Sequence, residues 1–240
     1  AGVHGDEVSG PMTFYHHLNE VVDLIHENGF KVIIYPLRNP SGFEKSLRYN
    51  IDNDAGDGGN NDLVRYELAD GTIADDLQDK NVFKKWHWAS DMRLKIKLPI
   101  ETKLFHKLLK KDIKYNIVAS LDLHQDCITK PQKPASYFYA FDDTTVYAPI
   151  VKQIAKKISI WKNKKISAGF ASGMPLKSDN RGFINRHDGT LTDLCRRLGI
   201  EHSITVETSG TTPLKTAIEV NMLWIRGILD LLKKTTFNNS

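Results

Sequence analysis

The clearest strand signal in this chain is the run YNIVASLDLH, which extends from Tyr115 to His124. A short apolar run bounded by polar residues is typical of a buried strand. Similar runs predict strands at 30–37, 137–141 and 200–207. Helical spacing of apolar residues predicts helices in the segments around them, at 11–28, 99–111, 146–160, 190–198 and 213–232. Strands that alternate with helices indicate an α/β domain, with a mixed, mostly parallel central sheet flanked by helices.

Composition supports one globular domain. The chain has 240 residues, of which 40% are hydrophobic and 26% charged, as in an ordinary globular protein. No apolar run reaches the roughly 18 residues that a membrane-spanning helix needs, so we expect no membrane contact. We find no linker or repeat, whereas segment 38–75 is expected to be rich in loops.

Charge and cysteine content give weaker expectations about partners. The net charge is +4, and lysines cluster at 110–111, 156–157, 162–165 and 233–234. Such clusters usually form solvated helix faces and loop tips, and no nucleic-acid-binding motif accompanies them, so we expect no nucleic acid partner. Two cysteines do not form a disulfide framework and favour a reducing compartment such as the cytoplasm. The oligomeric state is left open.

The first residues contain a candidate metal-binding pair. His4 and Glu7 lie three residues apart on a short segment that contains Gly5, so both side chains can turn toward one cation. The pair His17 and Glu20 has the same spacing, but it falls inside a predicted helix and is expected to be a solvated ion pair. A strand should lead into a site at His4 and Glu7, and none precedes them. We therefore expect residues 1–240 to be a single domain that lacks its native N-terminal segment.

A third candidate ligand stands at the end of a predicted strand. Residues two apart in a strand share a face, so Asp122 and His124 point the same way. A carboxylate beside a metal-binding histidine can orient its ring. Together, His4, Glu7 and His124 would supply three ligands and leave a fourth position for water, which is the composition of a catalytic zinc site.

Further acidic and basic residues could complete such a site. Glu207 ends an apolar strand, where an unpaired carboxylate is costly; beside zinc-bound water it would act as general base and then as proton donor. Arg38, Arg48 and Arg65 are candidates to stabilise an oxyanion or to hold a substrate carboxylate.

In combination, these motifs resemble the zinc metallocarboxypeptidases of the carboxypeptidase A type, whose relatives include the succinylglutamate desuccinylase and aspartoacylase deacylases. The order runs H-x-x-E, N-P-x-G with a following Arg, D-x-x-R, D-x-H and a strand-end Glu, over residues 4–207. The resemblance implies a zinc carboxypeptidase-like fold and one zinc ion per chain. It also implies a role for each matching residue: zinc ligands His4, Glu7 and His124; general base Glu207; carbonyl-polarising Arg48; carboxylate-binding Arg65; and Asp62 as support for a zinc-binding histidine.

This sequence departs from the family pattern at two positions. Val64 stands where the family usually has an Asn that helps to bind the terminal carboxylate. Asn185 stands at the position of the peptidases' substrate-binding Tyr, and His187 or Arg186 is a possible substitute. These changes concern the substrate pocket and leave the zinc chemistry intact.

The resemblance leaves the substrate open between two classes. The long interval from Arg48 to Arg65 favours a carboxypeptidase-like enzyme that cleaves an amide next to a free carboxylate. The short interval from Asn39 to Arg48 is closer to that of the deacylases, which act on N-acyl amino acids. A non-catalytic binding module with basic patches is a further alternative. Neither G-x-S-x-G nor H-E-x-x-H is present, so serine hydrolases and helical metalloproteases are not expected.

Several other residues have alternative readings. Cys127 follows His124 closely, but it has no evident base partner and is expected to be a packed thiol. The segment 86–88, Trp-His-Trp, could form a pocket wall or core. The tyrosines near the third predicted strand are expected to be core residues: Tyr137, Tyr139 and Tyr147.

Overall fold

A mixed five-stranded sheet forms the centre of the molecule in the computed structural model, which describes residues 1–74, 82–88, 92–127, 133–166, 176–185, 187 and 189–237. Its strands run in the order β4, β10, β5 and β6, and β9 also pairs with β5. Only the pairing of β10 with β5 is antiparallel. The predicted α/β fold with a mostly parallel sheet is therefore confirmed. The strand bounds are β4 Ala119–Asp126, β10 His202–Ser209, β5 Ala135–Tyr139, β6 Ser159–Ile160 and β9 Phe183–Ile184.

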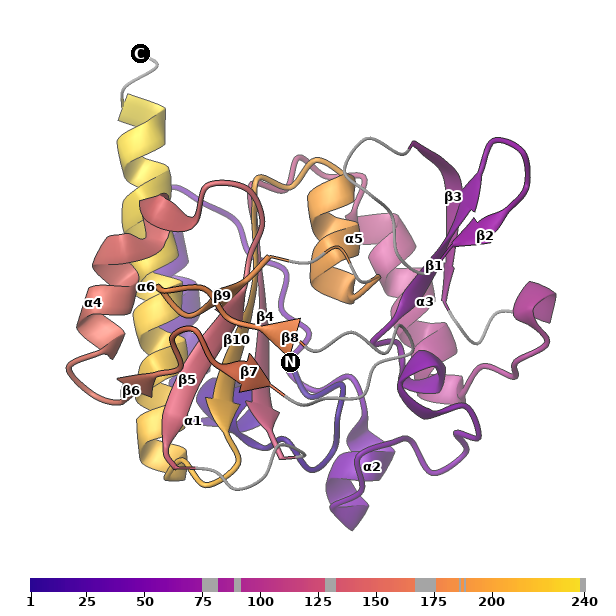
Figure 1. The fold of residues 1–240 in the computed structure, drawn as a ribbon, viewed down its shortest axis with the longest axis horizontal. Helices are drawn as coiled ribbons and strands as arrows, with labels where there is room; N and C mark the ends of the chain where they lie inside the picture. The colour runs from indigo at the N-terminus through magenta and orange to yellow at the C-terminus, as the bar shows by residue number, and fades with distance from the viewer. Residues whose placement is uncertain are drawn as a thin grey trace.

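Helices cover both faces of this sheet (Figure 1). On one side lie α1 (Ser9–Glu27), α4 (Ala148–Ile154) and α6 (Leu214–Phe237). Buried residues of α4 and α6 form one apolar cluster with the sheet, and those of α1 form a neighbouring cluster with α6. On the other side lie α5 (Leu191–Arg197) and α3 (Ile100–Asp112). This arrangement leaves the carboxyl ends of β4 and β10 at one edge, where ligands bind in α/β folds.

Segment 38–75 is more ordered than its composition suggests. It contains a short helix, α2 (Pro40–Lys45), a 3₁₀ helix, η1 (Gly56–Asn60), and the strands β1 (Val64–Leu68) and β2 (Ile73–Ala74). With β3 (Phe83–Trp88), β1 and β2 form a second, antiparallel sheet that packs on α3 and α5. Trp88 is fully buried in this second core, so it is a packing residue.

Two predicted elements differ in the structure. No strand forms at 30–37; its backbone contacts with the chain start are few, such as the bond from the Ala1 ammonium to the Tyr35 carbonyl at 2.9 Å. The predicted helix 146–160 is divided into a 3₁₀ turn, η3 (Thr144–Tyr147), α4 and β6, because the chain turns after α4. The remaining short elements are η2 (Met92–Leu94), β7 (Lys165–Ile166) and β8 (Leu176–Lys177).

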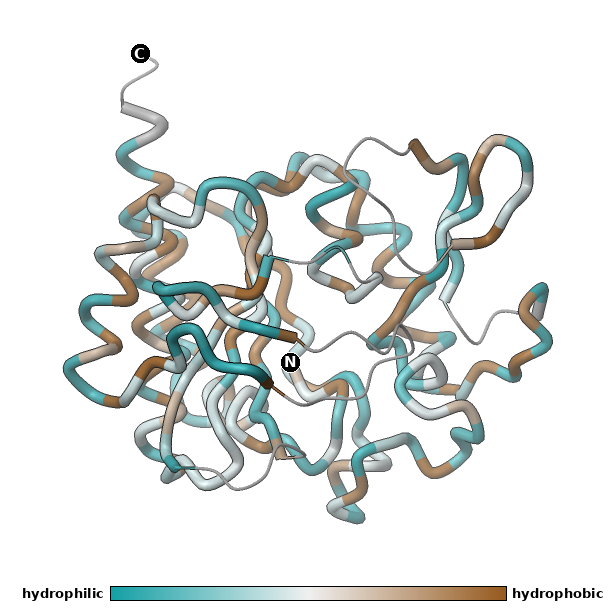
Figure 2. The backbone as a smooth tube through the Cα atoms, in the orientation of Figure 1, coloured by the Kyte–Doolittle hydropathy of each residue, from teal (hydrophilic) through white to brown (hydrophobic). Residues whose placement is uncertain are grey.

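Apolar and polar positions alternate along the helices that flank the sheet (Figure 2). The lysines of the clusters at 110–111, 156–157, 162–165 and 233–234 are all exposed, as predicted. Among the described residues, no helix combines the length and the apolar character needed to cross a membrane.

Candidate metal centre and active site

The loop that carries His4 and Glu7 is fixed by a glycine. Gly5 donates its N–H to the carbonyl of Arg48 at 3.0 Å. A Cβ atom on Gly5 would lie 2.2 Å from the carbonyl carbon of Gly42 in α2, so only glycine fits at this position. The close packing turns the loop, and Glu7 donates its own N–H back to the His4 carbonyl at 3.3 Å. Both side chains are buried as a result.

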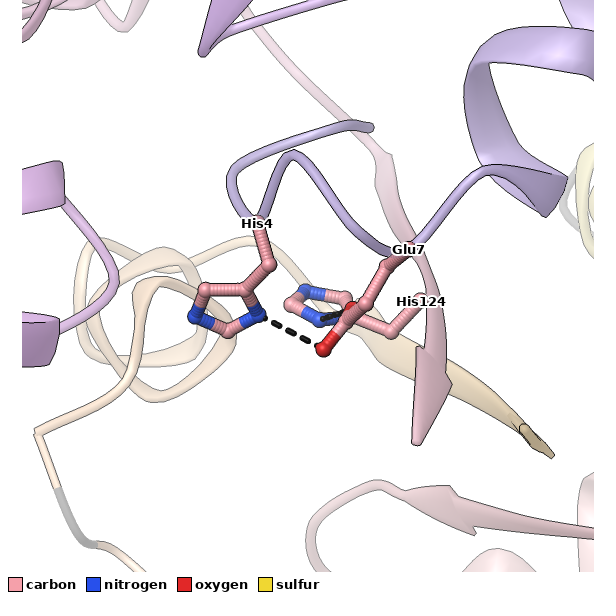
Figure 3. Close-up of side chains that lie close together, drawn as sticks. All are labelled: His4, Glu7 and His124. Carbon is pink, nitrogen blue, oxygen red and sulfur yellow. Dashed lines mark hydrogen bonds and ion pairs between the residues drawn. The ribbon is translucent and has the colours of Figure 1, made fainter. Parts of the chain in front are cut away.

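His124 on β4 completes the group around one carboxylate (Figure 3). His4 Nδ1 lies 2.8 Å from Glu7 Oε1, and His124 Nδ1 lies 2.9 Å from Glu7 Oε2. The three ligand atoms lie within 4.8 Å of one another. The structure therefore brings together the three residues that the sequence predicts as metal ligands.

The two rings have the orientation that metal-bound histidines need. Each ring directs Nδ1 toward Glu7 and Nε2 toward a second carboxylate: His4 Nε2 lies 3.3 Å from Asp62 Oδ2, and His124 Nε2 lies 3.2 Å from Asp122 Oδ2. A carboxylate behind the ring fixes the tautomer that leaves Nδ1 free to bind a metal. Two imidazoles and one carboxylate fit zinc with one open position. The residues present thus fit a catalytic metal ion.

The surrounding carboxylates favour the positively charged form of both histidine rings. Burial alone would lower the pKa of His124, but Asp122 and Glu7 outweigh it and raise that pKa to about 10. The pKa of His4 is likewise raised, against burial, chiefly by Glu7 and Asp62. A bound metal ion would take the place of the protons that these pKa values describe.

Arg38 binds Asp122, the carboxylate behind the His124 ring. Its NH2 group donates to both oxygens of Asp122, at 2.9 and 3.0 Å. Both side chains are buried, and Arg38 holds the pKa of Asp122 well below its usual range despite burial. Arg38 does not line the pocket, so it is not placed to bind an oxyanion or a substrate carboxylate.

Arg48 contacts Glu7, one of the candidate metal ligands. Its NH1 group lies 2.9 Å from Glu7 Oε1, and NH2 lies 3.2 Å from Asp57 Oδ1. Burial alone would lower the pKa of Arg48, but Glu7 and Asp57 raise it, so the guanidinium is charged. Asn39 orients the backbone here, since its amide donates to the Arg48 carbonyl at 2.9 Å while its oxygen accepts from Gly42 N–H as the N-cap of α2.

Glu207 lies beside His124 on the adjacent strand. The two residues are opposite each other in the parallel ladder of β10 and β4, and Glu207 Oε1 lies 3.9 Å from His124 Nδ1. Glu207 Oε2 is buried and has no hydrogen-bond partner among the described residues. Burial, together with Glu7 and Asp126, raises the pKa of Glu207 well above its usual range. Such a carboxyl group is suited to take up and release a proton.

A pocket joins these groups. It is lined by residues of β4, β5 and β10, of the start of α5 and of the loops that carry the other candidate groups: His4, Glu7, Arg48, Asp62, Asp122, His124, Asp126, Tyr137, Tyr139, Thr190, Leu191, Thr192, Thr205 and Glu207. The tyrosines Tyr137 and Tyr139 are buried, as expected for core, and also form the pocket wall, whereas Tyr147 belongs to the core alone.

The two predicted substrate-binding residues do not line this pocket. Arg65 lies on β1, and its NH1 group donates to the Val64 carbonyl at 3.1 Å. Asn185 is exposed after the end of β9. Of its suggested substitutes, His187 contacts Asp193 Oδ1 at 2.6 Å, and Arg186 lies outside the described residues. The structure therefore brings together the candidate metal-binding and proton-transfer groups but not the predicted carboxylate clamp.

Sequence reasoning did not identify Asp57 and the hydroxyl pair of α5 and β10. Asp57 contacts both Arg48 and His4 Nε2, at 3.4 Å for the latter. The Thr192 and Thr205 hydroxyl oxygens lie 2.5 Å apart in the pocket wall. The density of Gly, Asn and Asp around Asp57 was the sole signal in the sequence for that residue.

The residues predicted to have no role in the site agree with the structure. His17 and Glu20 form an exposed ion pair on α1. Cys127 is half-buried, and burial followed by the nearby carboxylates Glu7 and Asp6 raises its pKa to about 12. A thiol with so high a pKa is a poor nucleophile at neutral pH.

Comparison with known proteins identifies the fold. No protein-family model and no curated protein matches this chain. A proposed metallopeptidase from Shewanella baltica matches 96% of this chain and 74% of its own, with a TM-score of 0.65 and 20% identity. A second, from Shewanella amazonensis, matches 97% of this chain and 75% of its own, with a TM-score of 0.63 and 19% identity. Bovine thrombin-activatable fibrinolysis inhibitor, solved with tick carboxypeptidase inhibitor, matches 100% of this chain and 81% of its own, with a TM-score of 0.50 and 16% identity.

Proposed function

We propose, from the zinc carboxypeptidase fold that this chain has, that it is a zinc-dependent hydrolase that cleaves an amide bond next to a free carboxylate. One observation carries the proposal. His4, Glu7 and His124, which come from two distant parts of the sequence, meet within 4.8 Å, and Glu207 lies beside them in the same pocket.

The metal would supply Lewis-acid chemistry: when bound, it polarises the scissile carbonyl and makes water more acidic. His4 and His124 would hold it through Nδ1, with Glu7 as the third ligand. Asp62 and Asp122 would help to hold the two rings, because each carboxylate lies at ion-pair distance from an Nε2 atom.

Glu207 would transfer the proton. Its carboxylate would accept a proton from the attacking water and deliver it to the leaving amine. The raised pKa of Glu207 and its unpartnered Oε2 atom favour this role. Arg48 lines the same pocket as a permanent cation and would stabilise the negative charge that develops on the carbonyl oxygen.

A second candidate function is the hydrolysis of N-acyl amino acids, which the short interval from Asn39 to Arg48 favours. Both substrate classes carry a free carboxylate, so the position of Arg65 outside the pocket does not distinguish them. A matched pair of substrates, a peptide and an N-acyl amino acid with the same terminal residue, separates the two functions.

The first experiment measures the metal content of the purified protein by mass spectrometry. We expect about one zinc ion per chain, lost in His124→Ala and retained in the control His17→Ala, whose ring is exposed on α1. Glu207→Gln should keep zinc and lose turnover of both substrate classes. Folded protein that binds no zinc after its addition, or a Glu207→Gln variant with normal turnover, would refute the proposal.

A further inference from the structure

A cluster of lysines lies on the hairpin formed by β7 and β8. We call it the lysine hairpin; it comprises Lys162, Lys164, Lys165 and Lys177. All four side chains are exposed. In the sequence from 162 to 181, Asp179 is the single acidic residue. Its Oδ1 atom already accepts the N–H groups of residues 181 and 183, both at 2.8 Å. The hairpin therefore carries a large excess of positive charge.

This charge does not stabilise the hairpin. Lys165 and Lys177 lie directly opposite each other in the antiparallel pair, where like charges are unfavourable. Their neighbours Ile166 and Leu176 point inward and are buried, so both lysines point outward. Among the described residues, none of the four lysines forms an ion pair. Charge that is unfavourable for the fold and unpaired within it is available to a ligand.

The hairpin packs directly on the wall of the catalytic pocket. The Nζ atom of Lys164 lies 4.3 Å from the ring centroid of Trp161. That ring stacks on Tyr137 with centroids 5.4 Å apart and planes 5° from parallel. Tyr137 lines the pocket. Ile166 and Leu176 belong to the same apolar cluster as these two rings, so hairpin and pocket wall form one packed unit.

The pocket itself does not favour an acidic substrate. Its lining includes five carboxylates: Glu7, Asp62, Asp122, Asp126 and Glu207. Arg65, the predicted anchor for a carboxylate, does not line it. Arg48 is the one arginine among the described residues of this lining, so the carboxylates outnumber it, and additional attraction of a negatively charged substrate would come from cations outside the pocket.

We propose that the lysine hairpin binds the part of the substrate that extends out of the pocket, and that preferred substrates carry Glu or Asp in that part. The inference rests on the proposed hydrolase function and adds a substrate class to it: peptides with acidic residues near the scissile bond. The exposed, mutually repelling lysines would gain favourable ion pairs when such a segment binds.

The test compares two peptides that share the residues at the scissile bond and differ only in three upstream residues, Glu in one and Gln in the other. The variant replaces three lysines together, Lys162→Gln, Lys165→Gln and Lys177→Gln, and leaves Lys164 on its ring. The matched control replaces three exposed lysines of α4 and α6 on the opposite face of the sheet, Lys152→Gln, Lys233→Gln and Lys234→Gln.

We expect the wild type to have a KM about tenfold lower for the Glu peptide than for the Gln peptide, since three exposed ion pairs contribute modestly each. The preference should disappear in the hairpin variant, persist in the control and weaken at high salt, while kcat stays unchanged. Equal KM values for both peptides in the wild type would overturn the inference and leave the hydrolase proposal intact.

A binding measurement separates the two proposals. Fluorescence anisotropy of a labelled Glu peptide with the Glu207→Gln protein reports docking without turnover. If neither peptide is hydrolysed but the Glu peptide binds in a lysine-dependent manner, docking stands and the hydrolase proposal fails. If a single-stranded oligonucleotide binds through the same lysines more tightly than the Glu peptide does, the hairpin is a nucleic-acid surface and the inference is overturned.

Discussion

Replacing Arg38 by Met removes the cation that neutralises Asp122 behind the candidate metal centre. Arg38 donates to both Asp122 oxygens at 2.9 and 3.0 Å, and both side chains are buried. Breaking a buried ion pair costs about 3–5 kcal/mol because one charge is left without compensation. Asp122 keeps a weaker partner, His124 Nε2 at 3.2 Å, so we expect the lower end of that range.

A loss of about 3 kcal/mol corresponds to a melting temperature lower by about 6–12 °C for a chain of this size. Thermal unfolding followed by circular dichroism measures it. The double variant Arg38→Met with Asp122→Asn should recover part of the loss, since the carboxylate charge is then removed as well. The control Arg226→Met breaks an exposed pair with Glu20 and should cost less than about 1 kcal/mol.

The same substitution tests whether Arg38 helps to position His124. Loss of a carboxylate contact behind a metal-binding histidine typically weakens metal affinity about 10–100-fold. We expect Arg38→Met to weaken zinc affinity within this range, measured by competition with a chelator, because Asp122 is then free to move away from His124. A melting temperature within 3 °C of the wild type, together with unchanged zinc affinity, would refute the reasoning.

Three other predictions follow from local features. Gly5→Ala should lower stability by about 1–3 kcal/mol and weaken zinc binding, because its Cβ would lie 2.2 Å from the α2 backbone; chemical denaturation that finds no change contradicts this packing. Burial raises the pKa of Cys127 to about 12 and that of Cys195 to about 11, so native protein at pH 8 should react slowly with a thiol reagent and expose two thiols only after unfolding. Burial lowers the pKa of His202, so the unfolded state binds more protons near pH 6; the free energy of unfolding should fall more steeply from pH 7.5 to 5.5 in the wild type than in His202→Gln, and equal slopes would disprove it.

Parts of the candidate metal centre were predictable from sequence because they follow local rules. The two-residue repeat of a strand placed Asp122 on the same face as His124, and the observed contact is 3.2 Å. The H-x-x-E spacing needed only a tight turn, which Gly5 provides. These relations depend on neighbours in the chain, so the sequence contains them.

The position of Arg65 depends on strand β1, which lies in a segment whose composition predicts loops. Once Val64–Leu68 is known to be a strand, alternation places Val64 and Tyr66 in the core and Arg65 on the opposite face. Segment 30–37 shows the reverse case, because it has the apolar character of a strand but does not form one. A strand also requires a continuous ladder of hydrogen bonds with a partner strand. The residues of the segment do not specify that partner. Pairing partners are a property of the whole fold.

The sequence does contain a signal for the start of the short helix α2. Asn39 caps its first turn, and Pro40 occupies the first helical position, which is the usual start of a helix. With only six residues, it lacks the apolar periodicity by which longer helices are found.

The register of β4 against β10 has a consequence for how a protein with this fold could change the molecule it binds. Glu207 and His124 occupy opposite positions on adjacent strands, so their separation is set by the backbone ladder, about 4.8 Å between strands. Substitutions in the surrounding loops cannot move one without the other unless the ladder itself breaks. The proton-transfer group and the metal ligand would therefore be inherited as a unit, while α5, the β7–β8 hairpin and the loop before β1 are free to diverge toward new substrates.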